Sequence, residues 1–413
     1  MGMSLPDAAW RTRPGLAALT AVLGSASAQS RFVGGAVRDT LLGLTPADTG
    51  AIDIDIATSL PPQEVLERLE DARIRAVPTG LAHGTITAVT EGGTVEITTL
   101  RRDVATDGRH ATIAYTDDWR EDAARRDFTI NALYADPVSG EIFDYFGGLD
   151  DLSAGRVRFI GDPLQRIAED HLRILRFFRF HARFGDVPDP DGLAACTARA
   201  NDLMALSRER IAAEMLKLLV ARGAVPTLEL MIAHSILLPV LPEITAAGVA
   251  KMAKVAQHET AAGLQPDPLR RLAALLPHDP SMAEVIANRL KFSNAQRRRL
   301  ILALSGPERE PGDTPQTLAY RLGCDGALDR WLLTTSGAEA VEGARAIIGF
   351  EIPAFPLTGG ALVQRGVGKG PDVARLLRQV EEAWVAEGFP DADRTAQLAD
   401  DAVDQWQRSS SIA

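Results

Sequence analysis

The chain has 413 residues, of which 46% are hydrophobic and 24% are charged, the composition of an ordinary soluble globular protein. Because a single hydrophobic core does not extend over 413 residues, we expect two to four domains. The formal net charge of −11 excludes a general nucleic-acid coat protein, although it permits local basic surfaces.

The two cysteines, Cys196 and Cys324, lie far apart and offer neither a disulfide framework nor a metal-ligand cluster. We therefore expect a reducing, cytoplasmic environment. The N-terminal segment lacks a basic stretch followed by a long apolar run, and no segment has the length and apolarity of a transmembrane helix. We expect neither a signal peptide nor a membrane partner.

The first 150 residues predict a mixture of helices and strands. In chain order we expect a helix over 5–30, a strand over 31–33, helices over 36–43 and 61–71 separated by a strand over 52–57, strands over 74–77, 85–90 and 94–100, a helix over 121–133 and a turn at 143–148. Residues 101–121 are polar and aperiodic, which predicts a mobile loop near the site.

Gly34 and Gly35 stand between the first predicted strand and the helix over 36–43. A strand, a glycine pair and a helix can place backbone N–H groups around a phosphate. Arg38 lies about one turn into this helix, where its guanidinium can reach the same anion. Because such a pair is also common as a plain tight turn, these residues alone leave both interpretations open.

Asp53 and Asp55 alternate with isoleucines along the strand predicted over 52–57. Successive strand residues face opposite sides, so both carboxylates point to one face. A divalent cation between them stabilises such a pair, and hard oxygen ligands suit Mg²⁺. The alternative is a solvated strand edge. Glu96, on the strand over 94–100, is the candidate for a third catalytic carboxylate facing the pair.

From Gly161 onward strands largely vanish, and Asp162 and Pro163 predict the start of a helix that runs to about residue 184. Residues 156–184 hold seven arginines against three acidic residues. Four of these arginines recur at helical spacing and form an arginine ridge: Arg173, Arg176, Arg179 and Arg183. With few acids nearby in sequence, we expect the ridge to bind anions. Further helices are expected over 208–221, 225–232, 246–262, 268–276, 281–291, from 293, from 316 and over 372–387, with a linker at 305–315.

Four motifs occur in a specific order and spacing: Gly34-Gly35-Ala36-Val37-Arg38-Asp39, Asp53-Ile54-Asp55, Arg125-Arg126-Asp127-Phe128-Thr129-Ile130-Asn131-Ala132 and Glu169-Asp170-His171-Leu172-Arg173. Together they resemble the class II tRNA nucleotidyltransferase and bacterial poly(A) polymerase family. The motifs that carry the resemblance lie in about the first 220 residues.

The resemblance implies an α+β fold. In it, an N-terminal nucleotidyltransferase head with a mixed sheet, similar to that of DNA polymerase beta, precedes an all-α neck, body and tail. The expected domains are the head over residues 1–150, a helical neck over 151–222 that carries the nucleotide-selecting helix, a helical body over 223–305, and a helical tail over 306–413 with tRNA contacts.

The resemblance also implies roles for individual residues. Asp53 and Asp55 bind Mg²⁺ in a two-metal transfer that activates a 3′-hydroxyl and neutralises the leaving pyrophosphate, and Glu96 stays our candidate for a third catalytic carboxylate. The nucleotide-binding residues are Gly34, Gly35, Arg38, Arg126, Asp127, Asn131, Asp170, Arg173, Arg176 and Arg179.

Asp170 and Arg173 are three residues apart, which places them on one face if the helix is continuous. Cytosine and adenine each offer an amino donor beside an acceptor, which suits a carboxylate and a guanidinium. Uracil and guanine offer a carbonyl and a ring N–H instead, and each unmade buried bond costs ~1–3 kcal/mol. The pair can therefore select C and A without a template, and Glu169 is expected to orient Arg173.

The expected function is addition of C, C and A to the 3′ end of tRNA, with CTP and ATP as substrates. The alternatives are a poly(A) polymerase, an enzyme restricted to CC or A addition, and a non-catalytic RNA-binding homologue. A basic run, Arg297, Arg298 and Arg299, is a candidate RNA contact, with a solvated helix start as the alternative. The oligomeric state is left open.

Overall fold

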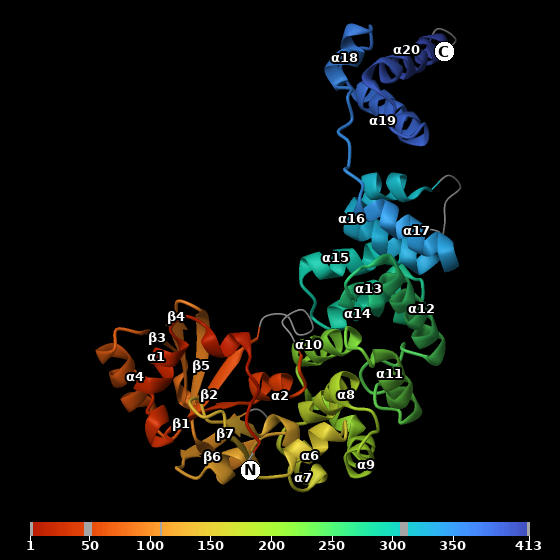
Figure 1. Cartoon of the computed structure of the whole chain (residues 1–413). Coiled ribbons are helices and arrows are strands. Elements are labelled where there is room, and N and C mark those ends of the chain that lie inside the picture. Colours follow the sequence, from red (N-terminus) through yellow and green to blue (C-terminus); the bar gives the residue numbers. More distant parts are fainter. Residues whose placement is uncertain (1–2, 45–51, 108–109, 306–312, 411–413) are drawn as a thin grey trace. The chain divides into compact units, whose positions relative to one another are not determined.

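A computed structural model describes residues 3–44, 52–107, 110–305 and 313–410 (Figure 1). The chain divides into two compact units, Met1–Pro242 and Glu243–Ala413. The first unit contains the strands of the described chain, and the second consists of helices and their connections. This arrangement confirms the predicted α+β fold with a mixed-sheet head followed by helices.

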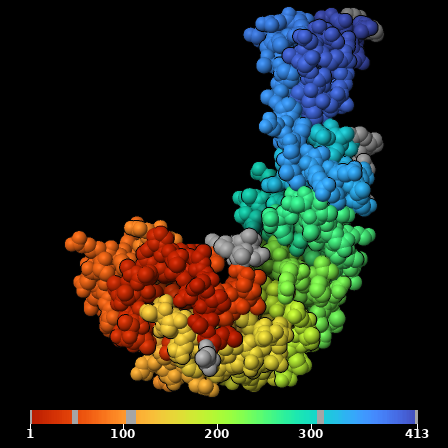
Figure 2. Space-filling view, viewed as in Figure 1, coloured from red at the N-terminus to blue at the C-terminus, as the bar shows by residue number. Residues whose placement is uncertain are grey.

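A seven-stranded sheet forms the head, in the order β3-β4-β5-β2-β1-β8-β9. Its strands are β1 Ser30–Val33, β2 Ile54–Thr58, β3 Arg75–Gly80, β4 Thr85–Thr90, β5 Gly93–Thr99, β8 Leu133–Ala135 and β9 Ile142–Asp144. The β2–β5 pair is parallel and the other neighbours are antiparallel, so the sheet is mixed. Ile54 and Ile56 on β2 are fully buried, as the strand alternation predicts. In the space-filling view the first unit, coloured red to yellow-green, is one continuous body (Figure 2).

Short helices support this sheet. They are α1 Leu16–Val22, α2 Gly35–Leu41, α4 Pro62–Asp71, α5 Trp119–Ala124 and α6 Gly148–Ser153. Helix α2 packs against β1, β2 and β8, while α4 packs against β3 and β4. The prediction of one helix over 5–30 is wrong, because the backbone turns at Gly15 and Gly24, where φ is 83° and 72°, and only α1 and two short 3₁₀ helices form.

Two further predictions for the head are wrong. The loop expected over 101–121 is replaced in the described residues by β6 Arg101–Asp107 and β7 His110–Tyr115, which pair antiparallel. A two-stranded ribbon is held by backbone hydrogen bonds, which need no apolar alternation in the sequence. The helix expected over 121–133 ends at Ala124, and a 3₁₀ turn at Thr129–Asn131 leads into β8.

The rest of the first unit is helical, with α7 Pro163–Glu169, α8 Leu172–Phe184, α9 Pro190–Ala198, α10 Arg208–Leu219 and α11 Ala224–Ala233. The predicted continuous helix from 163 to 184 is therefore wrong. Asp170 takes an extended conformation (φ −152°, ψ 106°), and its Oδ1 accepts a hydrogen bond from the N–H of Leu172 at 3.1 Å. Asp170 is thus the C-cap residue of α7, and its carboxylate binds the first residue of α8.

The helices of the second unit are α12 Ala246–Ala262, α13 Pro268–Leu275, α14 Pro280–Arg289, α15 Asn294–Ala303, α16 Pro315–Thr334, α17 Gly337–Ile348, α18 Gly359–Gln364, α19 Pro371–Ala386 and α20 Ala392–Ser410. The capping box of Ser293 and Gln296 is present at the start of α15. Helix α20 was not predicted, and most of the predicted linker at 305–315 lies outside the described residues. Among the described helices, none combines the length and apolarity needed to cross a membrane.

Candidate active site

A cleft of about 660 Å³ in the first unit is lined by residues from all four motifs. It brings together twelve residues that the sequence singled out: Gly34, Gly35, Arg38, Asp53, Asp55, Arg126, Asp127, Asn131, Asp170, Arg173, Arg176 and Arg179. Glu96 and Glu169 do not line it. The cations of the cleft are seven arginines, set against five aspartates, and no lysine of the described chain takes part. Arginine's planar fork of donors matches phosphate and base edges.

Gly34 occupies the turn between β1 and α2. Its φ of 74° and ψ of −128° belong to a conformation that side chains rarely adopt. A Cβ atom built at Gly34 would lie 3.8 Å from Oδ2 of Asp55 and 3.8 Å from a terminal nitrogen of Arg126. Any side chain here would therefore occupy the space between the carboxylate and the guanidinium.

The two aspartates of the second motif both line the cleft, Asp55 from β2 and Asp53 from the residue before the strand begins. On β5, Glu96 is the register partner of Asp55. Burial, followed by the charge of Glu96, raises the pKa of Asp55 to about 6, although Arg126 opposes this shift. The acids at this end of the cleft are thus incompletely neutralised by protein cations.

This donor set fits a magnesium-type site that the protein completes only in part. Among the described residues, no group of three His, Cys, Asp or Glu side chains is placed to hold a metal ion. Mg²⁺ is commonly bound by one or two carboxylates, with phosphate oxygens of the substrate and water supplying the remaining ligands. Asp53 and Asp55 are two such carboxylates at the edge of a cleft large enough for a nucleotide.

Two residues that the sequence motifs did not indicate, Asp122 and Tyr134, hold the Arg126 guanidinium in place. Its NH2 atom lies 3.3 Å from Oδ2 of Asp122, and its Nε lies 3.2 Å from the hydroxyl of Tyr134, which donates to Asp122 at 2.7 Å. Burial by itself would raise the pKa of Asp122, but Arg126 and Arg125 lower it to about 2. The buried Asp122 carboxylate therefore stays ionised near neutral pH and forms a lasting ion pair with Arg126.

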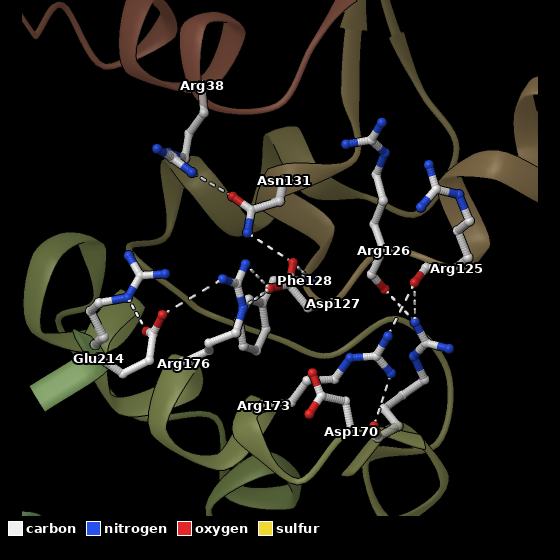
Figure 3. A network of polar contacts seen from close by, with 12 residues as sticks. Arg38, Arg125, Arg126, Asp127, Phe128, Asn131, Asp170, Arg173, Arg176 and Glu214 are labelled. Carbon is white, nitrogen blue, oxygen red and sulfur yellow. Dashed lines mark hydrogen bonds and ion pairs between the residues drawn. The ribbon is translucent and has the colours of Figure 1, made fainter. Parts of the chain in front are cut away.

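A chain of polar contacts crosses the cleft from α2 to α8 (Figure 3). Arg38 is only 5% exposed and donates to Oδ1 of Asn131, whose Nδ2 donates to Oδ1 of Asp127 at 2.9 Å. Arg176 then donates from Nε to Oδ2 of Asp127 at 2.7 Å. Although burial opposes ionisation, Arg176 and the hydrogen bonds lower the pKa of Asp127 to about 2. The third motif thus contacts α2 through Asn131 and α8 through Asp127.

Each arginine of the ridge is paired with an acid, and three of the four acids come from other parts of the fold. Arg173 binds Glu169, Arg176 binds Asp127, Arg179 binds Glu214 and Arg183 binds Asp39. The ridge thus has more counter-charge than the nearby sequence indicates, because tertiary folding adds Asp127, Glu214 and Asp39 to the local Glu169. Each guanidinium has several N–H donors, so a carboxylate partner fixes its direction and leaves other donors for a ligand.

The predicted base-selecting pair, Asp170 and Arg173, lies at the junction of α7 and α8 rather than along one helix. Arg173 donates to Oε2 of Glu169 at 2.5 Å and to the carbonyl of Arg166 at 2.8 Å. Glu169 is therefore in contact with Arg173, the residue that we expect it to orient. Oδ2 of Asp170 accepts from NH2 of Arg210 at 2.7 Å, a contact that no motif in the sequence indicated.

The basic run in the second unit does not act as a single patch. Arg299 binds Asp329 through two nitrogens, at 2.7 and 2.9 Å, and also Asp267 at 2.9 Å. Arg297 lies 3.3 Å from Glu284, whereas Arg298 is exposed. The structure therefore makes Arg299 a packing residue, whereas Arg298 is the most exposed member of the run and the Arg297 side chain is partly exposed.

Four further residues in or behind the cleft received no role from the sequence motifs. Two of them could have been found in the sequence, and two could not. Asp39 stands inside the first motif and Arg183 on the arginine ridge, so both were visible in the sequence. Arg210 lines the cleft and Glu214 holds Arg179, but only the packing of α10 on α8 brings these two residues to the site.

Comparisons with known proteins agree with this geometry. Residues 30–158 match the family model "Poly A polymerase head domain", and residues 188–247 match "Probable RNA and SrmB- binding site of polymerase A". The chain is 34% identical over 401 residues to CCA tRNA nucleotidyltransferase 1, mitochondrial, of Homo sapiens, covering 91% of this chain and 87% of that protein. It is 32% identical over 380 residues to the CCA-adding enzyme of Limosilactobacillus fermentum, covering 87% of this chain and 90% of that protein.

Among solved structures, the Bacillus stearothermophilus CCA-adding enzyme in complex with CTP superimposes with a TM-score of 0.69. The two sequences are 25% identical, and the match covers 96% of this chain and 99% of that chain. A sequence relationship over nearly the whole chain thus accompanies the shared fold. The chain belongs to the family of CCA-adding tRNA nucleotidyltransferases.

Proposed function

We propose that the protein adds C, C and A to the 3′ end of tRNA, with CTP and ATP as substrates and without a nucleic-acid template. The observation that carries this proposal is one cleft that holds both a carboxylate pair, Asp53 and Asp55, and a base-selecting pair, Asp170 and Arg173. A protein that only bound RNA would have no use for this combination.

Members of the family are metal-dependent in general. We assign Mg²⁺ as the metal, held by Asp53 and Asp55 together with phosphate oxygens and water. When bound, a pair of such ions activates the 3′-hydroxyl and neutralises the leaving pyrophosphate. Glu96 contributes to this end of the site through its charge on Asp55.

The protein's own part in the reaction is to bind and orient the nucleotide. In the proposal, Gly34 and Gly35 allow the triphosphate to approach the backbone, and Arg126, Arg176 and Arg179 neutralise it. Asp127 and Asn131 place the sugar and triphosphate. Arg38 contributes by holding Asn131, because its Nε, NH1 and NH2 atoms are engaged by Asp39 and Asn131.

Base selection is proposed for Asp170 and Arg173, held by neighbouring groups. Glu169 and two backbone carbonyls, of Arg166 and Arg125, fix the Arg173 guanidinium. Such second partners reduce the freedom of a recognition group and make its hydrogen-bond demands strict. A base that presents a carbonyl to the Asp170 carboxylate is then rejected.

We propose that the chain has four domains: head 1–150, neck 151–222, body 223–305 and tail 306–413. The three helical domains are proposed to contact the phosphates of tRNA. Arg298 is our candidate within the basic run. A cytoplasmic location stays a prediction, and the human relative carries "mitochondrial" in its name.

The test offers the purified protein three tRNAs, lacking one, two or three terminal nucleotides, with each NTP separately and with Mg²⁺. We expect C to be added twice, and A once and only after CC. The Asp53→Ala variant should add neither nucleotide yet still bind tRNA. Long runs of A would show a poly(A) polymerase, addition of C alone a CC-adding enzyme, and no incorporation a binding protein.

A further inference from the structure

Helix α10, Arg208–Leu219, directs two polar side chains from one face toward residues of the cleft. Arg210 and Glu214 are four residues apart, which places them on the same side of a helix, and α10 packs against α8. Arg210 contacts Asp170 at the start of α8, and Glu214 contacts Arg176 and Arg179 one to two turns further along α8. One face of α10 thus reaches both the base-selecting end and the phosphate-binding end of the cleft.

Arg210 fixes the direction of the Asp170 carboxylate, which helix geometry does not set at this position. Asp170 lies in the extended break between α7 and α8, so its direction depends on side-chain contacts. Oδ1 accepts from the N–H of Leu172 at 3.1 Å and Oδ2 accepts from NH2 of Arg210 at 2.7 Å. Each oxygen keeps a further lone pair for a base amino group. Without Arg210 the carboxylate keeps a single described partner and can rotate.

Glu214 acts at the other end and does not line the cleft. Its side chain is nearly buried, its Oε2 accepts from Nε of Arg179 at 2.5 Å, and its Oε1 lies 4.0 Å from NH1 of Arg176 (Figure 3). A contact at Nε leaves the two terminal nitrogens of Arg179, the fork that recognises phosphate. A buried carboxylate of this kind both neutralises and directs the guanidinium in front of it.

We propose that Arg210 and Glu214 are positioning residues that set two properties of the site separately. Arg210 sets the discrimination of C and A against U and G by holding Asp170. Glu214 sets the affinity for the triphosphate, whatever the base, by holding Arg179. This inference rests on the proposed function, since it names which side chains tune the same site.

We expect substitutions at the two positions to change different kinetic parameters. In Arg210→Gln, kcat/KM for CTP relative to UTP, and for ATP relative to GTP, should fall roughly 10- to 100-fold, as for other residues that orient a recognition group. Arg210→Lys, which keeps one charged donor, should recover part of the discrimination. In Glu214→Gln, KM for CTP and ATP should rise together, roughly tenfold, with discrimination unchanged.

Exposed residues of the same helix provide matched controls. Glu209→Gln removes an acid and Lys217→Gln removes a base on the solvent side of α10, and both should leave KM and discrimination unchanged. Should Glu214→Gln fail to fold, Glu214→Asp keeps the buried charge but shortens the side chain, and KM should then rise by a smaller factor with the same lack of base dependence.

A uniform rise in KM for all four nucleotides in Arg210→Gln, or a changed base preference in Glu214→Gln, would overturn the proposal. The dissociation constants of CTP, ATP and UTP, measured by equilibrium dialysis with Mg²⁺, give the same split without turnover. If the unaltered protein adds no CCA, the proposed function fails, while the binding constants still decide whether α10 positions the two ends of the cleft.

Discussion

Asp55 on β2 and Glu96 on β5 are register partners in the parallel strand pair of the head sheet. Burial, and next the charge of Glu96, raise the pKa of Asp55 to about 6, with Asp53 adding to the effect and Arg126 opposing it. Three acids thus act on one another at this end of the cleft, and Arg126 is the cation that opposes the rise in the pKa of Asp55. In our proposal a divalent cation supplies the missing positive charge.

Replacing Asp55 should stabilise the metal-free protein while abolishing its activity. Because the folded-state pKa lies above the ordinary value of 3.8, the ionised carboxylate costs stability above pH 6, and this cost disappears as the pH falls from about 6 toward 4. Asp55→Asn should therefore raise the free energy of unfolding by about 1–3 kcal/mol at pH 8 without divalent ions.

Thermal unfolding with and without Mg²⁺ checks this prediction. Mg²⁺ should raise the Tm of the unaltered protein at pH 8 but not that of Asp55→Asn, since only the former binds the ion at this site. Asp71→Asn, at an exposed acid on α4, is the control and should respond to Mg²⁺ as the unaltered protein does. An equal Mg²⁺ effect on all three proteins would contradict the assignment of the metal site.

Removing Arg173 should blur base selection. Arg173→Ala deletes the donor fork of the base-selecting pair, so misincorporation of U and G should rise roughly tenfold or more relative to C and A. Glu169→Gln should have the same effect in weaker form, because it loosens Arg173 without removing it. Single-turnover incorporation of each NTP measures the ratios, with Gln165→Ala at an exposed site of α7 as the control. Unchanged discrimination in Arg173→Ala would refute its role.

The Asp127–Arg176 ion pair should govern stability in acid. The pKa of Asp127 is lowered to about 2 in the folded protein, so the pair stabilises the fold above pH 4 and this contribution is lost as the pH falls through 2. In Arg176→Gln the buried carboxylate loses its main cation, and we expect about 1–3 kcal/mol of destabilisation at pH 7 and acid unfolding at a higher pH.

Far-ultraviolet circular dichroism during acid titration follows this transition. Arg222→Gln is the matched control, since it breaks an exposed pair with Asp186 at 3.7 Å and should leave the acid midpoint in place. The same acid midpoint for Arg176→Gln and the unaltered protein would show that another group controls acid unfolding.

Two neighbouring arginines of α15 should behave differently. Arg298→Ala removes an exposed cation, so tRNA affinity should fall about threefold to tenfold and the salt dependence of binding should decrease by about one ion. Arg299→Ala leaves the buried Asp329 without one of its partners and should cost about 2–3 kcal/mol of stability. Filter binding at several salt concentrations and thermal unfolding separate the two effects. A tRNA-binding loss confined to Arg299→Ala would reverse our assignment.

Much of the site could be predicted because its chemistry is local. The alternation of side chains in extended backbone predicts that Asp53 and Asp55 lie on one side, and both line the cleft, although β2 begins only at Ile54. The glycine at position 34 is needed where φ is positive, which is likewise a property of one residue. These features depend on neighbours in the chain, so the sequence contains them.

The partners of the arginines could not be predicted, because they depend on contacts between distant segments. Asp127 and Asp39 reach arginines of α8 from the head, and Glu214 and Arg210 reach α8 and its start from α10. The break at Asp170 likewise places the base-selecting pair at a helix junction, although the local pattern favours one continuous helix.

The sequence by itself therefore determined the motifs, the mixed-sheet head with its helical continuation, and twelve of the residues that line the cleft. Only the tertiary structure decided which guanidinium most of the carboxylates hold, that residues 101–107 and 110–115 pair as strands, and that Arg299 is engaged in packing while Arg298 is exposed. The physical reason is that hydrogen bonds and ion pairs are satisfied by whichever groups folding brings within about 3 Å, regardless of their distance along the chain.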